Sequence, residues 1–553
     1  MMMSLPKKTQ YYRKDITILV LIFTILFCFQ LGNRPFATPD EARYVEIPRE
    51  MVATGDYVTP RLNGVKYFEK PPLLYWLEAA SIKTFGLHEG VMRLWLVVFA
   101  VIGCLATYAF GRSCFDRTTG ITASLVLGGS VLYFSLGRLI TLDMPVSILV
   151  TLSLYSFYRA IESSAGPKRR AWYSAFAASC ALGVLTKGVM ALAVPGPVIL
   201  IWLTLARQWH RVLPAYIPTA LLIFLAITAP WHILVSLKNP EFAHKYFIVE
   251  HFLRYTTTVH LRYQPMWFFI PILIVGFLPW TAFVPAALVR AYRDRAHSVN
   301  SFLLIWIGWV FVFFSISNSK LIPYILPLFP PVALLIGRVV GGLWQKKQTS
   351  PRIFYGVGIT LLIGSLAGSI APYVDQTLLI GKEFLVPYID LLRGTFFVSG
   401  LFIVLAIRRH RMSQKTILAA IFGVSAVVAV VLIFASPHIQ RPSIKPLVDT
   451  FLLQKQPGDK IVSFLSYYQD LPVYSQQTVV VVEAKGELEF GTLVEDTRSW
   501  MMPESSFLEL WQKQKIWAVG RKTALDQFCQ RQPDFKCTII KQDNGNVLFT
   551  QPN

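Results

Sequence analysis

The chain has 553 residues, of which 54% are hydrophobic and only 15% are charged, and its mean hydropathy is +0.49. Soluble domains carry about 25% charged residues, so this composition is typical of an integral membrane protein. The net charge of +22 would suit a nucleic-acid-binding protein. However, the lysines and arginines occur in short clusters between apolar runs, which is typical of cytoplasmic loops that contact anionic membrane lipids. We therefore expect membrane lipid and no nucleic acid as a partner.

The start of the chain combines basic and apolar residues. Lys7, Lys8, Arg13 and Lys14 precede an apolar run from Ile16 to Leu31. A signal peptide has the same layout, but no small-residue cleavage motif follows this run. We expect an uncleaved first transmembrane helix with its N-terminus in the cytoplasm.

Apolar runs of about 20 residues, the length that crosses a bilayer, recur along the chain. About thirteen candidates lie near residues 15–32, 91–111, 119–137, 144–161, 171–187, 189–206, 213–235, 266–289, 300–316, 321–341, 353–373, 391–407 and 415–435. With the N-terminus inside, every second connection carries a basic cluster, which agrees with the positive-inside rule. The sequence predicts a polytopic α-helical membrane protein whose transmembrane domain covers residues 1–436.

Three stretches depart from this pattern. The first long loop, residues 33–90, contains the apolar patch Pro71–Leu77, which is too short to span and predicts a helix lying at the membrane interface. A second loop covers residues 236–265. Residues 437–553 have soluble composition and strand-like runs at 461–465, 478–482 and 547–550, so they predict a small α/β domain on the non-cytoplasmic side.

The cysteines divide into two groups. Four of the six are scattered in or beside apolar runs without metal-ligand spacing, which is typical of packing residues. Cys529 and Cys537 lie in the polar tail. In an oxidising compartment they would be able to form a disulfide, and the sequence leaves this open.

Acidic and basic side chains concentrate in the first long loop. Carboxylates and guanidinium groups alternate from Asp40 to Glu50 and recur at Glu69 and Lys70. Beside a membrane such charges are costly unless they are paired or functional, so a solvated salt-bridged loop is the alternative to a reaction site. Other charged and polar residues are predicted at helix ends on the same side: Arg138, Asp143, Lys187, Glu250, His251, Arg254, Lys320 and Tyr324. A carboxylate surrounded by lysine and arginine suits a reaction in which a phosphate is held and an acceptor is oriented.

The same residues carry a family resemblance. The loop motifs are Asp40-Glu41-Ala42-Arg43-Tyr44, Ile47-Pro48-Arg49-Glu50-Met51, Thr54-Gly55-Asp56, Leu62-Asn63-Gly64 and Tyr67-Phe68-Glu69-Lys70-Pro71-Pro72. Further motifs are Leu185-Thr186-Lys187-Gly188, Glu250-His251, Pro279-Trp280 and Ser319-Lys320-Leu321-Ile322-Pro323-Tyr324. Together they resemble the bacterial aminoarabinose lipid A transferases, which are C-type membrane glycosyltransferases related to protein O-mannosyltransferases. The resemblance runs to about residue 340, and the tail is similar only in placement and size.

The resemblance implies a fold and an activity. The fold is the C-type glycosyltransferase fold with a small C-terminal periplasmic α/β domain. The activity is transfer of 4-amino-4-deoxy-L-arabinose from undecaprenyl phosphate to lipid A phosphates on the periplasmic side of the cell inner membrane.

The resemblance also implies residue roles. Asp40 would be the main catalytic carboxylate and Glu69 would shape the site. Lys70, Arg254 and Tyr324 would bind the carrier phosphate, with Arg262 as the alternative to Arg254 in the same loop. Arg43, Asp143 and Lys320 would complete the substrate-binding set.

The resemblance also implies a bound metal ion, for which this sequence offers few ligands. Family members can hold a divalent ion such as zinc, and Glu69 and His251 would supply ligands. Two ligands are few for a site, so a structural histidine is the alternative, and we expect no cofactor to be required.

Several alternatives stay open. For a hydroxyl acceptor Asp40 would act as a general base, whereas for an ionised phosphate acceptor it would stabilise positive charge at the anomeric carbon or recognise the sugar amine. The same fold would also suit transfer of another polyprenyl-phosphate-linked sugar, a hexose or hexosamine, to lipid A, to another glycolipid or to a protein hydroxyl.

A transporter or flippase would predict charges near the bilayer midplane and internal repeats, whereas here the charges lie at helix ends. A structural scaffold would leave the loop acids dispensable.

Overall fold

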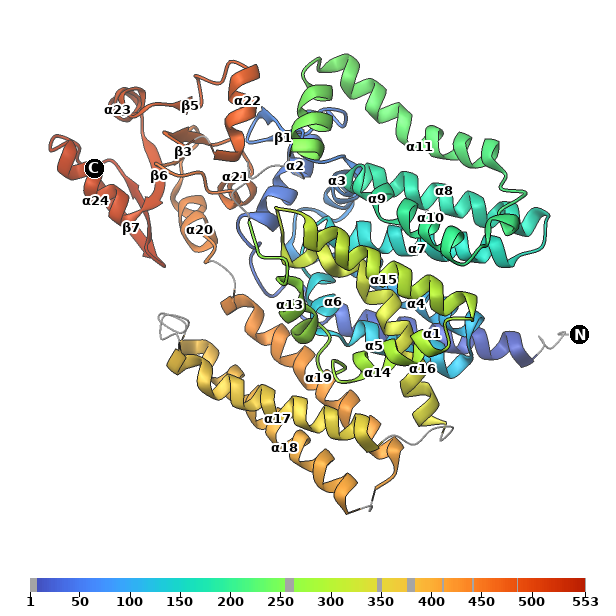
Figure 1. Cartoon of the computed structure of the whole chain (residues 1–553). Helices are drawn as coiled ribbons and strands as arrows, with labels where there is room; N and C mark the ends of the chain where they lie inside the picture. Colours follow the sequence, from blue (N-terminus) through green and yellow to red (C-terminus); the bar gives the residue numbers. More distant parts are fainter. Residues whose placement is uncertain are drawn as a thin grey trace, which may run out of the picture. The chain divides into compact units, whose positions relative to one another are not determined.

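The computed structural model describes residues 7–253, 263–345, 351–374, 383–409, 412–439, 442–484 and 486–552. The chain forms two compact units (Figure 1). The first unit contains residues 1–31, 93–233 and 243–436. The second contains residues 32–92, 234–242 and 437–553, so the first long loop belongs to the same unit as the C-terminal tail.

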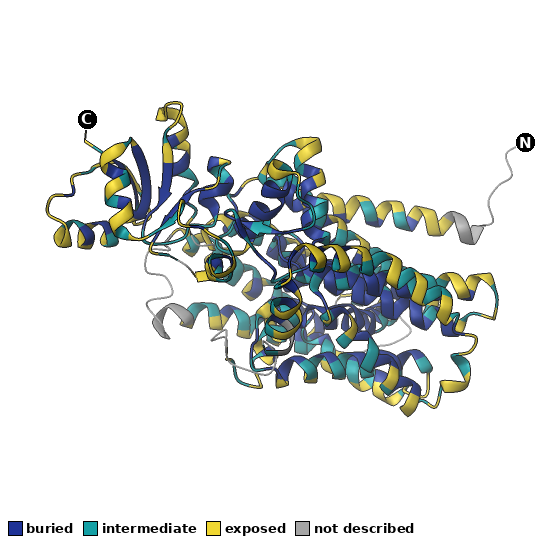
Figure 2. Ribbon diagram, turned by 90° about the horizontal axis from the view of Figure 1, so that it is seen from above, coloured by how far each residue is buried: buried dark blue, intermediate teal, exposed yellow. Residues whose placement is uncertain are grey.

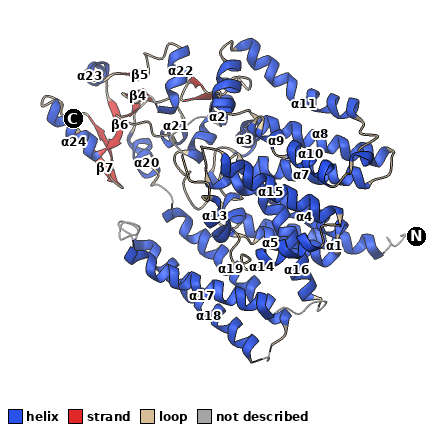
Figure 3. Ribbon diagram, viewed as in Figure 1, coloured by secondary structure: helices blue, strands red, loops and turns tan. Residues whose placement is uncertain are grey.

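The first unit is helical, and all strands among the described residues lie in the second unit (Figure 3). Its longer helices are α1 (Lys7–Cys28), α4 (Glu89–Cys114), α5 (Arg117–Gly128), α7 (Asp143–Glu162), α8 (Pro167–Lys187), α10 (Pro195–Leu205), α11 (Ile217–Lys238), α14 (Phe283–Arg293), α15 (Ser298–Ile316), α16 (Phe329–Trp344), α17 (Pro351–Val374), α18 (Val386–Arg408) and α19 (Gln414–Ile439). The shorter ones are α6 (Val131–Leu136), α9 (Met190–Ala193), α13 (Phe269–Gly276), the 3₁₀ helices Trp209–Arg211, Ile322–Leu328 and Glu383–Leu385, and a π-helical segment, His244–Leu253.

Eight helical segments in the described part of the chain are long and apolar enough to cross a membrane. They are Glu89–Cys114, Asp143–Glu162, Ile217–Lys238, Ser298–Ile316, Ile322–Trp344, Pro351–Ile370, Val386–Arg408 and Gln414–Ile439. Other predicted spans fall on interrupted helices: α5 and α6 share residues 119–137, and α13 and α14 share residues 266–289. The chain is therefore a multi-pass membrane protein, and the number of thirteen spans stays a prediction.

Close helix packing in the first unit depends on small residues. A Cβ atom added at Gly337 of α16 would lie 2.5 Å from the backbone of Ala123 on α5. The hydroxyl of Thr122 donates a hydrogen bond to the Gly337 carbonyl at 2.7 Å. Helices in lipid associate through such small-residue contacts and interhelical hydrogen bonds because hydrocarbon supplies no hydrophobic drive.

Helices of the first unit differ in exposure (Figure 2). α7 is buried along most of its length, whereas only a minor part of α17 and α18 is buried. The exposed positions of that pair include the apolar residues Ile363, Leu366, Phe397 and Val398. Exposed apolar side chains on spanning helices are expected where helices face lipid.

The second unit contains one large sheet. Its helices are α2 (Asp40–Thr54), α3 (Leu73–Phe85), α20 (Lys445–Gln454), α21 (Asp470–Ser475), α22 (Glu489–Val494), α23 (Glu504–Lys513), α24 (Lys522–Arg531) and the 3₁₀ helix Gly486–Leu488. Its strands are the pair β1 (Arg61–Leu62) and β2 (Val65–Lys66), and β3 (Lys460–Ser463), β4 (Val480–Val482), β5 (Met501–Met502), β6 (Ile516–Arg521), β7 (Thr538–Asp543) and β8 (Asn546–Thr550). The large sheet has the order β5-β4-β3-β6-β8-β7.

The predicted α/β character of the tail is confirmed. Strands β3, β4 and β8 overlap the three predicted runs, and β3 to β6 are parallel with intervening helices. β7 and β8 form a hairpin whose turn contains Asn544 and Gly545, both with positive φ, as tight hairpin turns require. β6 was not predicted, although its apolar run Ile516–Val519 is a strand signal.

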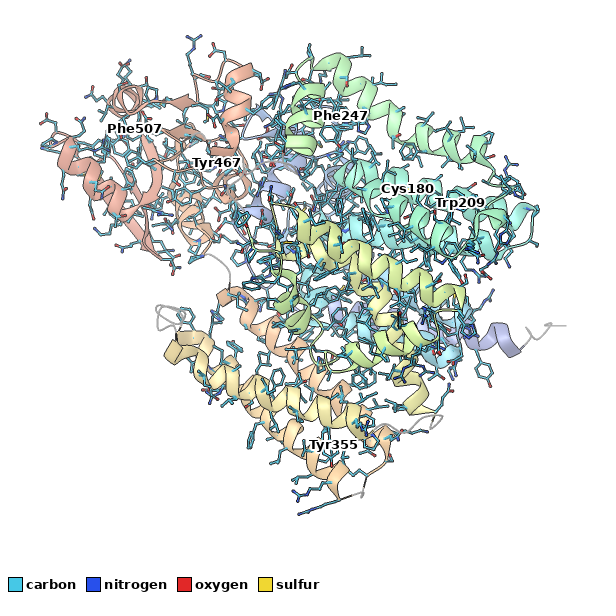
Figure 4. All side chains as sticks on the ribbon, viewed as in Figure 1. Cys180, Trp209, Phe247, Tyr355, Tyr467 and Phe507 are labelled. Carbon is cyan, nitrogen blue, oxygen red and sulfur yellow. The ribbon has the colours of Figure 1, made fainter. Side chains whose placement is uncertain are left out.

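Both faces of the sheet are covered because successive strand residues point to opposite sides. Val462, Ala518 and Phe549 pack with Phe507 of α23 and Phe528 of α24; Phe507 is labelled in Figure 4. On the other face, Ile461, Trp517 and Leu548 share a core with α20 and with Ile47, Met51, Leu62, Val65 and Tyr75 of the first long loop. The loop and the tail therefore fold as one hydrophobic core.

The apolar patch for which an interfacial helix was predicted lies at the start of α3, which has a buried face; its place at the membrane interface stays a prediction. Leu74 and Tyr75 are buried, and the Trp76 indole donates a hydrogen bond to the Tyr57 carbonyl at 2.9 Å. The patch thus contributes to the interior of its own unit.

The tail cysteines are free thiols in this structure. Both pack beside the core formed with α23 and α24. Burial and the neighbouring Cys529 thiol raise the pKa of Cys537 to about 11, which disfavours the reactive thiolate.

Glu78 on α3 predicts a pH-dependent stability. It is fully buried, and neither carboxyl oxygen has a hydrogen-bond partner. Burial, reinforced by the nearby Glu41, raises its pKa well above the usual value. Above about pH 4.3, the ordinary glutamate pKa, the unfolded chain is ionised here while the folded chain stays protonated, so stability falls as pH rises toward the folded pKa.

We expect Glu78→Gln, which stays neutral, to match the parent protein near pH 4 and to be more stable near pH 8. The gain should reach ~1 kcal/mol or more, since one pKa unit corresponds to about 1.4 kcal/mol. Thermal unfolding of the detergent-solubilised protein across this range measures it, with the exposed Glu489→Gln as the control. A pH-independent difference between Glu78→Gln and the parent would contradict the expectation.

Candidate active site

The predicted catalytic carboxylate lies at the start of α2. Asp40 and Glu41 occupy the first turn, where the helix dipole favours negative charge. The helix ends at Gly55, whose positive φ of 74° lets its N–H bond the Met51 carbonyl, as in a left-handed C-cap. The Asp40 side chain is 58% exposed, so a substrate is able to reach it.

Arg43 lies one turn after Asp40 and links it to two other groups. Its guanidinium contacts Asp40 Oδ1 at 2.5 Å, Glu487 Oε2 at 3.1 Å and the Tyr67 hydroxyl at 3.3 Å. It also lies 5.6 Å from the ring centre of Tyr44. With its side chain only 10% exposed, Arg43 is held in place and fixes one oxygen of Asp40.

Glu487 is the site residue that sequence reasoning missed. It comes from the 3₁₀ helix Gly486–Leu488 of the tail, and its Oε1 accepts a hydrogen bond from Gln469 at 2.8 Å. Burial raises its pKa, and the Arg43 charge opposes that rise. No local motif marks this residue, because only the shared core of loop and tail brings it to Arg43.

Glu69 and Lys70 follow the β1–β2 hairpin in the same unit. The Lys70 ammonium donates a hydrogen bond to the Glu69 carbonyl at 2.8 Å. The Glu69 carboxylate is close enough to Arg43 and Tyr67 to affect the pKa of both groups. The structure therefore brings Asp40, Arg43, Glu69 and Lys70 into one part of the second unit.

Buried polar contacts hold this loop in place. Arg34 forms a bidentate ion pair with Glu41, in which Nη1 lies 2.6 Å from Oε2 and Nη2 lies 3.1 Å from Oε1, and both side chains are buried. Asn63 exchanges two hydrogen bonds with the backbone of Val479 in the tail, at 3.0 and 2.9 Å. Arg61 pairs with Glu495 at 2.9 Å. The loop is thus anchored on both sides of the site.

The segment 234–242 is anchored to the same loop. Lys238 pairs with Asp56 and Glu241 pairs with Lys66, each at 2.7 Å. These ion pairs explain why the beginning of the second predicted loop belongs to the second unit.

Three of the predicted site residues, Asp143, Lys320 and Tyr324, lie in the first unit. α7 and α8 form an antiparallel pair, which brings Asp143 at the start of α7 beside Lys187 at the end of α8. The Lys187 ammonium contacts Asp143 Oδ1 at 2.5 Å and lies 4.7 Å from the ring centre of Tyr324. Both charges suit the dipoles of their helix ends. Lys187 had no assigned role in the sequence, and this cluster gives it a direct contact with two candidate residues.

Lys320 is buried and donates a hydrogen bond to the Gln264 carbonyl at 2.7 Å. Its ammonium also lies 5.9 Å from the ring centre of Tyr263. A buried ammonium group with a carbonyl partner keeps donors for an anion.

Two predicted residues cannot be placed. Arg254 lies outside the described residues, as does its alternative Arg262, and the side chain of His251 also lies outside them. Among the described side chains, no group of three or more His, Cys, Asp or Glu is arranged to hold a metal ion. The Glu69 and His251 ligand pair stays a prediction.

Two family models match the chain. The model described as dolichyl-phosphate-mannose-protein mannosyltransferase matches residues 69–234. The model described as aminoarabinose transferase C-terminal domain matches residues 447–550. The tail, which resembled the family only in placement and size, is thereby matched in sequence as well.

Curated relatives carry the name undecaprenyl phosphate-α-4-amino-4-deoxy-L-arabinose arabinosyl transferase. One from Sodalis glossinidius is 33% identical over 360 residues, which is 64% of this chain and 65% of the relative. One from Enterobacter sp. is 34% identical over 324 residues, 58% of each chain. The matched stretches thus span less than two thirds of these relatives.

The structural match covers almost the whole chain. The crystal structure of ArnT from Cupriavidus metallidurans bound to undecaprenyl phosphate aligns with a TM-score of 0.83 at 28% identity, over 97% of both chains. An archaeal oligosaccharyltransferase shares the fold alone, with a TM-score of 0.50 at 12% identity. Both domain matches, the named relatives and this end-to-end structural similarity show that the chain is similar in sequence and in fold to the aminoarabinose transferases.

Proposed function

We propose that this protein transfers 4-amino-4-deoxy-L-arabinose from undecaprenyl phosphate to phosphate groups of lipid A on the periplasmic side of the inner membrane. The observation that carries the proposal is the end-to-end similarity to an ArnT structure bound to undecaprenyl phosphate. Named relatives and the match of the tail to the aminoarabinose transferase C-terminal domain support the same sugar. The basic clusters of alternate connections support this orientation.

The chemistry is a single displacement at the anomeric carbon. The bond between that carbon and the carrier phosphate oxygen breaks, and undecaprenyl phosphate leaves with the electron pair. An oxygen of the acceptor phosphate forms the new bond from the opposite side, which inverts the anomeric configuration. The acceptor is already ionised, so no general base is needed, and the exposed oxygen of Asp40 is suited to stabilise positive charge at the anomeric carbon.

The second unit contains a carboxylate, a guanidinium and an ammonium group that suit this reaction. We assign Asp40 as the catalytic carboxylate and Arg43 as the residue that orients it. Lys70 is assigned to phosphate binding, because an ammonium group stabilises the charge that a leaving phosphate gains. Glu69 and Glu487 place further carboxylates around Arg43, where they suit recognition of a positively charged sugar amine.

The first unit supplies cations of its own. We assign Lys320 and Tyr324 to phosphate binding. Lys187 is neutralised by Asp143, so we assign this pair to orienting Tyr324 instead of holding an anion. Arg254 keeps its expected role in phosphate binding.

A second function keeps the carrier but changes the sugar. The match of residues 69–234 to a protein mannosyltransferase model favours a lipid-phosphate-linked sugar without choosing which one. The tail match favours aminoarabinose over this alternative.

Mass spectrometry of lipid A distinguishes the two. Cells that express the protein, in a strain lacking its own aminoarabinose transferase, should gain lipid A species heavier by one or two aminopentose units. The same cells with the Asp40→Asn variant should not gain them. A hexose or hexosamine increment, or unmodified lipid A with increments on protein, would overturn the assignment of sugar or acceptor.

A further inference from the structure

A polar cavity lies among helix ends in the first unit. It has a volume of about 260 Å³ and is lined by Phe115, Asp116, Thr119, Arg290, Arg338, Gly342 and Gln345. These residues come from the start of α5 and the ends of α14 and α16, which are close together in Figure 1. The predicted topology places this end on the cytoplasmic side, where the loops are rich in arginine and lysine.

Two guanidinium groups line this cavity, those of Arg290 and Arg338, and they differ in their hydrogen-bond and ion-pair partners. Arg338 contacts Asp294 at 3.0 Å and Asn300 Oδ1 at 3.2 Å, and lies 5.2 Å from the ring centre of Phe115. Arg290 makes no hydrogen bond or ion pair with any residue that the structure describes, and its Nη1 is buried. A buried guanidinium nitrogen without an acceptor is costly, and none of the described residues supplies an acceptor to Arg290 Nη1.

The acids near Arg290 do not supply that partner. The Asp294 carboxylate is paired with Arg338. Asp116 accepts a hydrogen bond from the Thr119 N–H at 2.8 Å and caps α5. Gln345 donates its amide to the Thr118 hydroxyl at 2.5 Å. Among the described lining residues, Arg290 is therefore a cation without an ion pair, and the Asp116 carboxylate, which is held by its backbone hydrogen bond, does not contact it.

We propose that this cavity binds a phosphate group, held by Arg290 with Arg338 beside it. Guanidinium forks match phosphate oxygens in shape and charge. The cavity lies at the ends of α14 and α16, where lipid headgroups meet water, and its volume admits one headgroup phosphate. The ligand's phosphate belongs to a phospholipid headgroup or to dissolved phosphate. This site is separate from the residues assigned to sugar transfer and does not depend on that assignment.

The test uses full-length protein purified in detergent, examined by native mass spectrometry and by thermal unfolding. One arm adds phosphatidylglycerol or phosphatidylethanolamine, and the other adds inorganic phosphate. We expect binding and a raised unfolding temperature with the phosphate source that the cavity takes. Arg290→Gln should weaken that binding by about tenfold or more, because a charge-assisted hydrogen bond is lost.

Two variants keep the test interpretable. Arg293→Gln removes an exposed charge from the same helix and should bind as the parent does. Arg290→Lys keeps the charge without the fork and should bind with intermediate affinity. Protection by lipid alone identifies a headgroup, and protection by inorganic phosphate identifies a dissolved ion. Absence of Arg290-dependent binding in both arms would mean that water alone fills the cavity, and would overturn the proposal.

Discussion

Asp40→Asn is expected to lower the rate of sugar transfer by about 10²- to 10³-fold, the usual effect of removing one group that stabilises transition-state charge. The substitution keeps the size of the side chain and its contact with Arg43 while removing the negative charge. Because the Asp40 side chain is largely exposed, stability should change little. Transfer from undecaprenyl-phosphate aminoarabinose to lipid A by the purified protein measures the effect.

The kinetic parameters separate the possible roles of Asp40. If it stabilises charge at the anomeric carbon, kcat should fall with little change in KM for the donor. If it recognises the sugar amine, KM should rise as well. Asp449→Asn, which removes an exposed carboxylate of α20 paired with Lys445, is the matched control and should transfer at the parent rate. Unchanged transfer by Asp40→Asn would remove Asp40 from the catalytic assignment.

Arg34→Met is expected to destabilise the second unit by about 3–5 kcal/mol, the usual cost of breaking a buried ion pair from one side. Arg34 and Glu41 are both buried and joined by two hydrogen bonds. Loss of the guanidinium leaves the Glu41 carboxylate buried without its charge partner. Since Glu41 follows Asp40 directly in α2, we also expect transfer to fall at temperatures where the protein is still folded.

Two controls show that the effect comes from the uncompensated charge. Arg498→Met removes a guanidinium from the exposed pair with Asp496, and because water screens exposed pairs, it should be close to neutral. The double variant Arg34→Met/Glu41→Met removes both charges and should recover much of the lost stability. Thermal unfolding in detergent measures all three. A double variant as unstable as the single one would assign the loss to packing instead of charge.

Much of the architecture could be predicted from local sequence. Apolar runs of spanning length predicted the helices, although breaks such as the one between α5 and α6 are not visible in hydropathy. Short strand-like runs in the tail predicted three of the strands. The motifs from Asp40 to Pro72 identified the family resemblance, because they place acids, cations and prolines at fixed short spacings.

The contacts around those motifs could not be predicted in the same way. Arg43 lies one turn from Asp40, so that pair follows from helix periodicity. Its contact with Glu487, and the contact of Lys187 with Asp143, depend on how separate elements pack. Hydropathy placed the first long loop with the membrane domain, whereas burial of Ile47, Leu62 and Tyr75 against the sheet joins it to the tail.

By itself, then, the sequence determined the membrane class, the helical character of most of the chain, the family resemblance, and the loop that carries the predicted catalytic carboxylate. These properties depend on composition and on residues near one another in the chain. Only the tertiary structure decided that the tail shares a core with that loop and contributes Glu487 beside Arg43. It also decided that Lys187 is paired with Asp143 and that Arg290 lines a cavity in which no described residue pairs with it. The reason is physical: whether a charge is neutralised depends on groups brought near it by packing, and those groups come from distant parts of the chain.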